Sequence, residues 1–335
     1  MSSRYSHSML ALYRLCPLRF RLAYEARLTP LQPASRHDMD FGSAWDAGLT
    51  AWYRDGDSGK ALDAFAAEYP ENRYPSILPL NSQGKTFENG LKGMATYIER
   101  WQEEDAHWTV LSLQERDTND ANDRILKMDM VVRDDRDGQV YGIDNKTTGG
   151  YLDNKYWSRY EPNSQVRMYA DRLNERYGDC GGFIINAASF KHRSKVYTPR
   201  QGPDKGVQQP AGDWHSFARM TFNPNENAIG LERESSAYWV GRIEADRASG
   251  VWGYNDQSCH AYGRECEYYA LCNAGYSWPQ DEELVLSYYR QQCPRVLEAG
   301  RCQLNLDHEG ECDATAPAVA DFEIETDDEI EEAVT

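Results

Sequence analysis

The chain has 335 residues, of which 40% are hydrophobic and 12% aromatic, so it can bury a sizeable core. No segment approaches the ~18 apolar residues of a membrane-spanning helix, and the N-terminus lacks a signal peptide's apolar stretch, so we expect a cytoplasmic protein without membrane association. The net charge of −18 is unusual for a protein that contacts DNA phosphates. However, twelve acidic residues and no Lys or Arg lie between Asp307 and Thr335, which leaves −6 on the rest.

The N-terminal third is predicted to be helical. Residues 4–27 have helical apolar spacing that Pro17 interrupts, and Cys16 lies at this interruption, where a lone cysteine is most often a small core residue. Residues 41–54 form a further predicted helix, and residues 60–107 form a mostly helical insert. The helix over 41–54 carries an apolar stripe at positions i, i+4 and i+7. The stripe consists of Trp45, Leu49 and Trp52.

Two segments rich in β-branched and apolar residues flank an acidic turn, which predicts a β-hairpin. The segments are residues 125–132 and 139–144. Each carries one carboxylate, Asp129 in the first and Asp144 at the end of the second. Lys146 follows Asp144 by two positions, so both side chains should lie on the same face of a strand. The pattern therefore predicts two acids and a lysine at one edge of a sheet.

These residue types suit a metal site that acts on phosphodiesters. Hard divalent cations prefer carboxylate oxygens, and magnesium shares its coordination shell with water and substrate phosphate. Such an ion lowers the pKa of bound water and neutralises charge on the phosphodiester. A fixed ammonium beside it would orient the attacking hydroxide or stabilise the developing charge. The alternative is a surface hairpin with a salt bridge between Asp144 and Lys146.

A helix and a buried strand are predicted to follow the hairpin. Gln165 and Tyr169 lie one helical turn apart and share a face. They would contact DNA or metal-bound waters, or Tyr169 would simply pack on the sheet. Residues 181–190 are almost wholly apolar and predict the buried strand. This order of helices and strands favours an α/β core with a mixed sheet.

Three cysteines cluster towards the C-terminal end, with the spacing C-x6-C-x5-C. They are Cys259, Cys266 and Cys272. Clustered thiols in a cytosolic protein indicate metal binding before disulfides. Three thiolates need a fourth ligand. Four thiolates suit a [4Fe–4S] cluster or a structural zinc, and His260 is an alternative ligand that would complete a zinc site. No usable spacing relates the remaining cysteines, Cys180, Cys293, Cys302 and Cys312.

Together these motifs resemble the PD-(D/E)XK nuclease superfamily, and within it the RecB-like branch. Asp129 matches the first acid of that family, Asp144-Asn145-Lys146 the acid-x-Lys element, and Gln165-x-x-x-Tyr169 the Gln-x-x-x-Tyr element. Residues 8–20 resemble its N-terminal Cys-Pro segment, and the three clustered cysteines resemble its C-terminal cysteines. The resemblance runs in order from about residue 5 to residue 275.

The resemblance implies a restriction-endonuclease-like fold, in which helices flank a central mixed sheet, with a helical N-terminal insert. A nuclease domain would span residues 1–280, with its core at about 108–195. The implied activity is metal-dependent DNA hydrolysis with Mg²⁺ or Mn²⁺, often as an exonuclease in recombination, repair or replication, where a partner protein of those processes would be expected. Similar enzymes are CRISPR-associated and phage exonucleases. The resemblance also makes Cys16 the fourth ligand of an iron–sulfur cluster that closes the domain.

One position departs from the family pattern. Where the branch usually has a metal-binding histidine, four residues after Gly42, this chain has Asp46. A carboxylate can replace imidazole for a hard metal, so Asp46 is expected to be a third ligand beside Asp129 and Asp144. The alternative is a solvated helix acid.

The C-terminal part is predicted to contain an extension, residues 281–312, and a disordered acidic tail, residues 313–335. Such a tail aids solubility, binds a basic partner or mimics DNA. Two other functions therefore compete with the nuclease. The chain would be a catalytically silent DNA-binding or scaffolding module of a recombination complex, or an interaction protein that acts through its tail.

Overall fold

The computed structural model describes most of the chain up to residue 301. The described residues are 5–31, 36–74, 82–119, 124–198, 206–208, 210–261, 265–291, 296–297 and 300–301. They belong to two compact units, which we call the sheet unit and the cysteine unit. The sheet unit consists of Arg36–Asn119 and Leu126–Arg233, and the cysteine unit of Met1–Ser35, Asp120–Ile125 and Glu234–Thr335. The predicted acidic tail lies outside the described residues, as do Cys293, Cys302 and Cys312.

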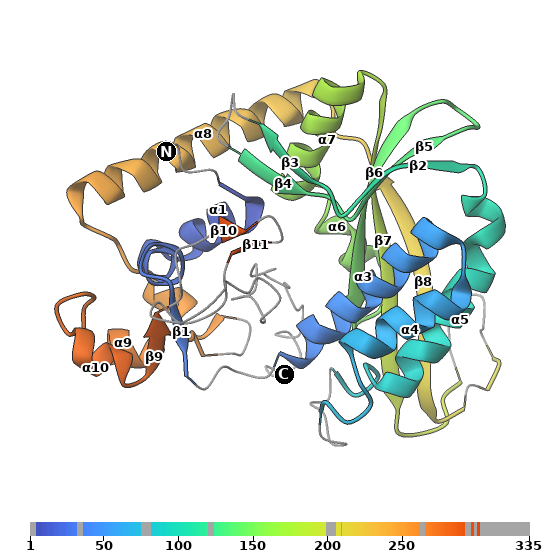
Figure 1. Ribbon diagram of the computed structural model, residues 1–335, viewed down its shortest axis with the longest axis horizontal. Coiled ribbons are helices and arrows are strands. Elements are labelled where there is room, and N and C mark those ends of the chain that lie inside the picture. Colours follow the sequence, from blue (N-terminus) through green and yellow to red (C-terminus); the bar gives the residue numbers. More distant parts are fainter. Residues whose placement is uncertain are drawn as a thin grey trace. The chain divides into compact units, whose positions relative to one another are not determined.

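The sheet unit is built on a five-stranded mixed sheet with strand order β2-β5-β6-β7-β8 (Figure 1). The strands β6 and β7 are parallel, and the other neighbouring pairs are antiparallel. Its members are β2 Trp108–Leu113, β5 Met130–Asp134, β6 Val140–Thr148, β7 Cys180–Arg193 and β8 Gly212–Phe222. The predicted α/β core with a mixed sheet is therefore confirmed.

Helices cover both faces of this sheet, because β7 is apolar on both sides. Phe183, Ile185 and Ala187 pack with α6 and α7, while Ala188 and Phe190 pack with α3, α4 and α5. Figure 1 shows α3, α4 and α5 grouped together against the strands. The helices are α3 His37–Asp55, α4 Ser58–Glu68, α5 Phe87–Asp105, α6 Asn154–Ser158 and α7 Ser164–Tyr177.

The predicted hairpin differs from the observed one at its first strand. The apolar segment divides into β4 Arg124–Lys127 and β5, and Asp129 lies at the bend between them rather than inside a strand. The turn from β5 to β6 forms as expected, with Gly138 in the left-handed region at φ 74°. Its first acid, Asp134, accepts hydrogen bonds from Arg136. The strand β3 Arg116–Asn119 precedes β4.

The cysteine unit has a separate core, formed by short N-terminal helices and segments from the C-terminal part of the chain. The N-terminal elements are α1 His7–Leu15, α2 Pro17–Phe20, the π-helix η1 Arg21–Glu25 and β1 Leu28–Pro30. The C-terminal elements are the 3-10 helix η4 Asp256–Ser258, α9 Tyr269–Ala274, α10 Glu282–Leu286, β9 Tyr289–Gln291, β10 Val296–Leu297 and β11 Gly300–Arg301. The long helix α8, Glu226–Ser249, contributes residues to both units. None of the helices within the described residues has the length and apolar character needed to cross a membrane.

Candidate functional site

Asp144 and Lys146 lie on the same face of β6, as the alternation of a strand requires. Their side chains form an ion pair with 3.0 Å between Lys146 Nζ and Asp144 Oδ2. Asp144 is 3% exposed, so this is not the surface salt bridge that the sequence left open as an alternative. Burying a carboxylate is costly unless charge and hydrogen bonds compensate it. A buried acid with an adjacent ammonium therefore indicates a specialised site.

Asp129 is held beside this ion pair by the main chain of β6. Its Oδ2 atom accepts a hydrogen bond from the backbone N–H of Asn145 at 2.7 Å. Because Met130 pairs with Ile143 in the antiparallel register of β5 and β6, Asp129 comes opposite Asp144. The structure thus brings Asp129, Asp144 and Lys146 together at the end of the hairpin, although Asp129 precedes its strand.

Asp46 reaches the same region from α3, where it is held by two side-chain amides. Its Oδ1 atom accepts from Asn145 Nδ2 at 2.9 Å, and its Oδ2 atom accepts from Gln114 Nε2 at 2.5 Å. Burial raises the pKa of Asp46, and the negative charge of Asp144 raises it further. The two amides and the charge of Lys127 act in the opposite direction. Asp46 and Asp144 are therefore close enough to interact electrostatically.

Sequence reasoning missed Asn145 and Gln114, which tie Asp46 and Asp129 together. Asn145 donates to Asp129 through its backbone and to Asp46 through its side chain. Gln114 does the same, with its backbone N–H donating to the Asp129 carbonyl at 2.9 Å. The position of Asn145 between Asp144 and Lys146 indicated that its side chain faces the other side of the sheet. Gln114 lies at φ 53°, a left-handed conformation that the sequence pattern does not predict.

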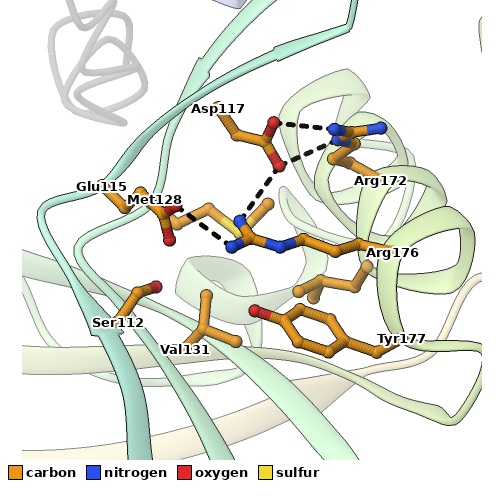
Figure 2. Close-up of a pocket in the computed structure, with 9 residues that line it drawn as sticks. Ser112, Glu115, Asp117, Met128, Val131, Arg172, Arg176 and Tyr177 are labelled. Carbon is orange, nitrogen blue, oxygen red and sulfur yellow. Dashed lines mark hydrogen bonds and ion pairs between the residues drawn. The ribbon is translucent and has the colours of Figure 1, made fainter.

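The corner that carries Gln114 is fixed to α7 by ion pairs. Figure 2 shows Arg172 and Arg176 of α7 directed towards Asp117 and Glu115, which follow Gln114 in the chain. Arg172 forms two contacts of 2.8 Å with Asp117, and Arg176 lies 3.1 Å from Glu115. Arg172 lowers the pKa of Asp117 through its hydrogen bonds, so this carboxylate stays ionised and its two-point contact with Arg172 is kept. These ion pairs therefore fix the segment that carries Gln114 and its side-chain amide.

Comparison with known families decides which kind of protein carries this arrangement. A family model described as the PD-(D/E)XK nuclease superfamily matches residues 4–273. This chain belongs to the PD-(D/E)XK nuclease superfamily. The predicted family and its restriction-endonuclease-like fold are thereby confirmed.

Solved structures include a similar protein from Eubacterium rectale, provisionally described as an exonuclease, with a TM-score of 0.44 and 15% sequence identity. The similarity covers 77% of this chain and 88% of the other. No curated protein matches the chain.

In this PD-(D/E)XK protein, Tyr169 of the Gln-x-x-x-Tyr element is buried. Its hydroxyl donates to the carbonyl of Lys127 at 2.8 Å, just before Asp129, and its ring packs edge-on against Phe183. Burial raises the pKa of Tyr169, and the charge of Asp144 acts in the same direction. Gln165 lies 3.5 Å from the Tyr169 hydroxyl and is partly exposed. Tyr169 therefore packs on the sheet, while Gln165 stays partly accessible.

PD-(D/E)XK nucleases typically use Mg²⁺ or Mn²⁺, and the chemistry of these donors fits such ions. Asp46, Asp129 and Asp144 offer carboxylate oxygens only, the ligands that hard divalent cations prefer. Repulsion between Asp46 and Asp144 is the kind of interaction that a bound cation relieves. Across the residues that the structure describes, no three or more His, Cys, Asp or Glu side chains are already arranged to hold a metal ion.

The four cysteines of the predicted cluster all lie in the cysteine unit. Cys16 precedes Pro17 at the start of α2, and the backbone N–H of Cys266 donates to the carbonyl of Cys259 at 2.7 Å. Burial raises the pKa of the Cys272 thiol, and the charges of Cys16 and Cys259 raise it further. Each of the four is a free thiol. Four cysteine side chains are the donor set that a structural zinc or an iron–sulfur cluster uses, so these residues fit such a centre by their chemistry.

Proposed function

We propose that this protein is a metal-dependent DNA nuclease that hydrolyses phosphodiester bonds, with an exonuclease as the favoured mode. The observation that carries the proposal is the buried Asp144 with Lys146 at 3.0 Å, beside Asp129 and Asp46. Acids that can hold a divalent cation beside a fixed ammonium support hydrolysis of a phosphodiester.

Each residue would have a distinct role. Asp129 and Asp144 would hold Mg²⁺ or Mn²⁺, with Asp46 as a third ligand. The bound ion would supply an activated water and neutralise charge on the phosphate. Lys146 would orient the attacking water or stabilise charge that develops on the phosphate. Gln165 would support the substrate from its accessible position on α7, and Tyr169 would fix the segment before Asp129 through its hydrogen bond to Lys127.

A group of basic and aromatic side chains supports a nucleic-acid substrate. Lys191 Nζ lies 3.1 Å from the centre of the Tyr151 ring, and the Arg193 guanidinium lies 4.2 Å from the centre of the Trp214 ring. Tyr151 is 62% exposed, so the face of its ring that Lys191 does not cover is open to a stacked base. In a chain with a net charge of −18, this local concentration of cations and rings favours phosphates and unstacked bases.

Tyr151 and Lys191 connect to the candidate site through the sheet. Thr148 at the end of β6 pairs with Ser189 of β7, two residues before Lys191. Tyr151 follows β6 three residues later. A strand rises ~3.3 Å per residue, so a nucleic-acid strand cleaved at Lys146 would reach Tyr151 within a few nucleotides.

Replacing Tyr151 by alanine is expected to weaken binding of single-stranded oligonucleotides by about 5- to 150-fold, because stacking on an aromatic ring contributes ~1–3 kcal/mol per base. Fluorescence anisotropy with a labelled oligonucleotide measures this change. Tyr238→Ala is the matched control, because Tyr238 is 60% exposed but belongs to the cysteine unit. Equal affinity of the two variants would show that Tyr151 does not contact DNA.

The test of the proposed function is cleavage by the full-length protein, purified without oxygen, in the presence of Mn²⁺ or Mg²⁺. The substrates are linear and circular DNA, each single- and double-stranded. Cleavage of linear DNA alone identifies an exonuclease, because circular DNA has no ends. Cleavage of circles identifies an endonuclease. Metal-independent cleavage, or none with either ion, contradicts the proposal.

We also propose that Cys16, Cys259, Cys266 and Cys272 bind a [4Fe–4S] cluster that stabilises the cysteine unit. Burial, together with Cys16 and Cys259, raises the pKa of the Cys272 thiol, and a backbone hydrogen bond joins Cys266 to Cys259; both observations support a shared centre. Burial also raises the pKa of Cys266 to about 12. A thiol that resists ionisation on its own needs a strongly binding cation to become a thiolate ligand.

Protein purified without oxygen is therefore expected to be brown and to contain about four irons, the content of such a cluster. Cys272→Ser should bleach it and lower the melting temperature, because metal binding is coupled to folding. Cys180→Ser is the control, since Cys180 is a free thiol in the sheet unit and should keep the colour. Stoichiometric zinc without iron would identify a structural zinc site instead.

A further inference from the structure

We propose that Asn186 and Arg219 are positioning residues for the candidate metal site. A row of hydrogen bonds across β6, β7 and β8 sets the direction in which Asn145 donates to Asp46. This inference rests on the proposed function, because it assigns Asp46 to the metal site of a nuclease. Neither Asn186 nor Arg219 is placed among the groups that would touch substrate or metal.

The row follows the register of the sheet. Asn145 of β6 pairs with Asn186 of β7, and Asn186 pairs with Arg219 of β8. Arg219 Nε donates to Asn186 Oδ1 at 3.1 Å, and Asn186 Nδ2 donates to Asn145 Oδ1 at 2.7 Å. Asn145 Nδ2 then donates to Asp46 Oδ1 at 2.9 Å. Four side chains from three strands and α3 thus form one continuous chain of donors and acceptors.

The chemistry of arginine gives this row a single direction. A guanidinium group donates hydrogen bonds and accepts none, so Asn186 must present its carbonyl oxygen to Arg219. Its amide hydrogens then point towards Asn145, which must offer its own carbonyl oxygen in return. The amide hydrogens of Asn145 are left facing Asp46. An isolated asparagine side chain fits either way round, but Arg219 removes that freedom at every step.

Arg219 itself is locked in place at the start of the row. Its guanidinium contacts both carboxylate oxygens of Asp105, at 2.5 and 2.9 Å. The hydroxyls of Tyr97 and Tyr53 lie 2.5 and 3.0 Å from Arg219 Nη2. Arg219 and Asp105 have side-chain exposures of only 9% and 5%. A group held this rigidly cannot turn to accommodate a change elsewhere, so it can impose an orientation on its neighbours.

The consequence for the site is that Asp46 always faces a donor. Partners that orient metal ligands typically change metal affinity by about 10- to 100-fold when they are lost. If the amide of Asn145 turned over, its carbonyl oxygen would face the Asp46 carboxylate, and the two acceptors would repel each other. Asp46 would then leave the position that the row defines for it.

Asn186→Asp tests this by reversing the row while nearly keeping the shape of the side chain. The new carboxylate still accepts from Arg219 but can no longer donate to Asn145, so Asn145 must turn its amide hydrogens towards position 186. The Tyr97 hydroxyl, which now accepts from Asn186 at 2.7 Å, can rotate and donate instead. We expect Mn²⁺ affinity to fall by about 10-fold or more in isothermal titration calorimetry. The Michaelis constant for DNA should stay unchanged.

Asn89→Asp is the matched control for the cost of burying a new acid. Asn89 is 3% exposed and lies in the sheet unit, but it donates to the carbonyls of Gly84 and Trp214 and has no place in the row. This variant should lose at least as much stability as Asn186→Asp and keep Mn²⁺ affinity within about twofold, since distant sites act independently. If Asn186→Asp yields no soluble protein, Asn186→Leu removes the row without adding a charge and should weaken Mn²⁺ in the same direction.

A double-mutant cycle in the absence of metal and DNA decides the inference independently of activity. Asp46→Asn supplies a donor that can satisfy the turned carbonyl of Asn145. Asn186→Asp should therefore lower the melting temperature less in the Asp46→Asn background than in the wild type. Positions 46 and 186 are expected to be coupled because Asn145 contacts both, and Asn186→Leu, which adds no charge, excludes direct repulsion between two carboxylates as the cause. The Asn186→Leu variant therefore enters the same cycle.

These experiments distinguish failure of the inference about the row from failure of the proposed nuclease function. Additive effects at positions 46 and 186 overturn the inference, whether or not the protein cleaves DNA. Wild-type cleavage with unchanged Mn²⁺ affinity in Asn186→Asp also overturns it, while the proposed function stands. If the wild type cleaves no DNA, the proposed function fails, and a non-additive cycle still supports the row.

Discussion

Replacing Asp144 by asparagine, or Lys146 by alanine, is expected to lower DNA cleavage by ~10³-fold or more, comparable to or beyond the loss of one preorganised transition-state contact. Asparagine keeps the shape of Asp144 but removes the negative charge that would hold the metal. Alanine at position 146 removes the ammonium that lies 3.0 Å from Asp144 Oδ2. Initial rates of cleavage with saturating Mn²⁺ measure both effects, and circular dichroism checks that the fold is kept.

Two controls come from nearby surface positions. Asp135→Asn removes an exposed acid from the turn of the same hairpin, and Lys155→Ala removes an exposed cation from α6. Both should cleave DNA within about twofold of the wild type, since surface substitutions away from special features change little. Full activity in Asp144→Asn and Lys146→Ala would place the reaction elsewhere in the protein.

The face shared by Asp144 and Lys146 was predictable, because a strand alternates whatever surrounds it. The buried strand β7 was predictable for a similar reason. A mostly apolar segment that follows two glycines needs cover on both faces, and α3 to α5 and α6 to α7 provide it. The family was predictable because the motifs occur in the correct order along the chain.

The position of Asp129 was not predictable from composition alone. The apolar segment before it continues without a glycine or proline, yet the chain bends there and β4 and β5 separate. Tyr169 contributes to this bend through its hydrogen bond to Lys127. That contact joins residues 42 positions apart in the sequence, so the local sequence pattern cannot predict it.

The row of hydrogen bonds through Asn145, Asn186 and Arg219 was also not predictable from the sequence. Asn186 is a polar residue inside a mostly apolar strand, which indicates a buried hydrogen-bond partner but not which residue provides it. The partner becomes visible only when the register sets Asn186 beside Arg219, 33 residues further along the chain. Long-range register is a property of the assembled sheet, whereas alternation is a property of each strand.

Replacing Arg219 by methionine is expected to cost about 3–5 kcal/mol of folding free energy, because it leaves a buried carboxylate without its counter-ion. Among the described residues, the remaining hydrogen-bond donor to the Asp105 carboxylate would then be the Tyr53 hydroxyl, at 2.7 Å. The guanidinium also lies 4.0 and 4.7 Å from the ring centres of Trp101 and Trp108. Urea unfolding followed by tryptophan fluorescence measures the change, because two of the nine tryptophans contact this guanidinium.

The matched control is Lys92→Met on α5, the helix that also carries Asp105. Lys92 pairs with Glu88 at 2.7 Å, but the two side chains are 66% and 78% exposed. An exposed pair of this spacing contributes only ~0.3–0.5 kcal/mol. The cost of Arg219→Met comes from the buried Asp105 carboxylate that loses its counter-ion. Adding Asp105→Leu should therefore restore part of the lost folding free energy. If Arg219→Met unfolds at the same urea concentration as Lys92→Met, the buried ion pair does not hold β8 against α5.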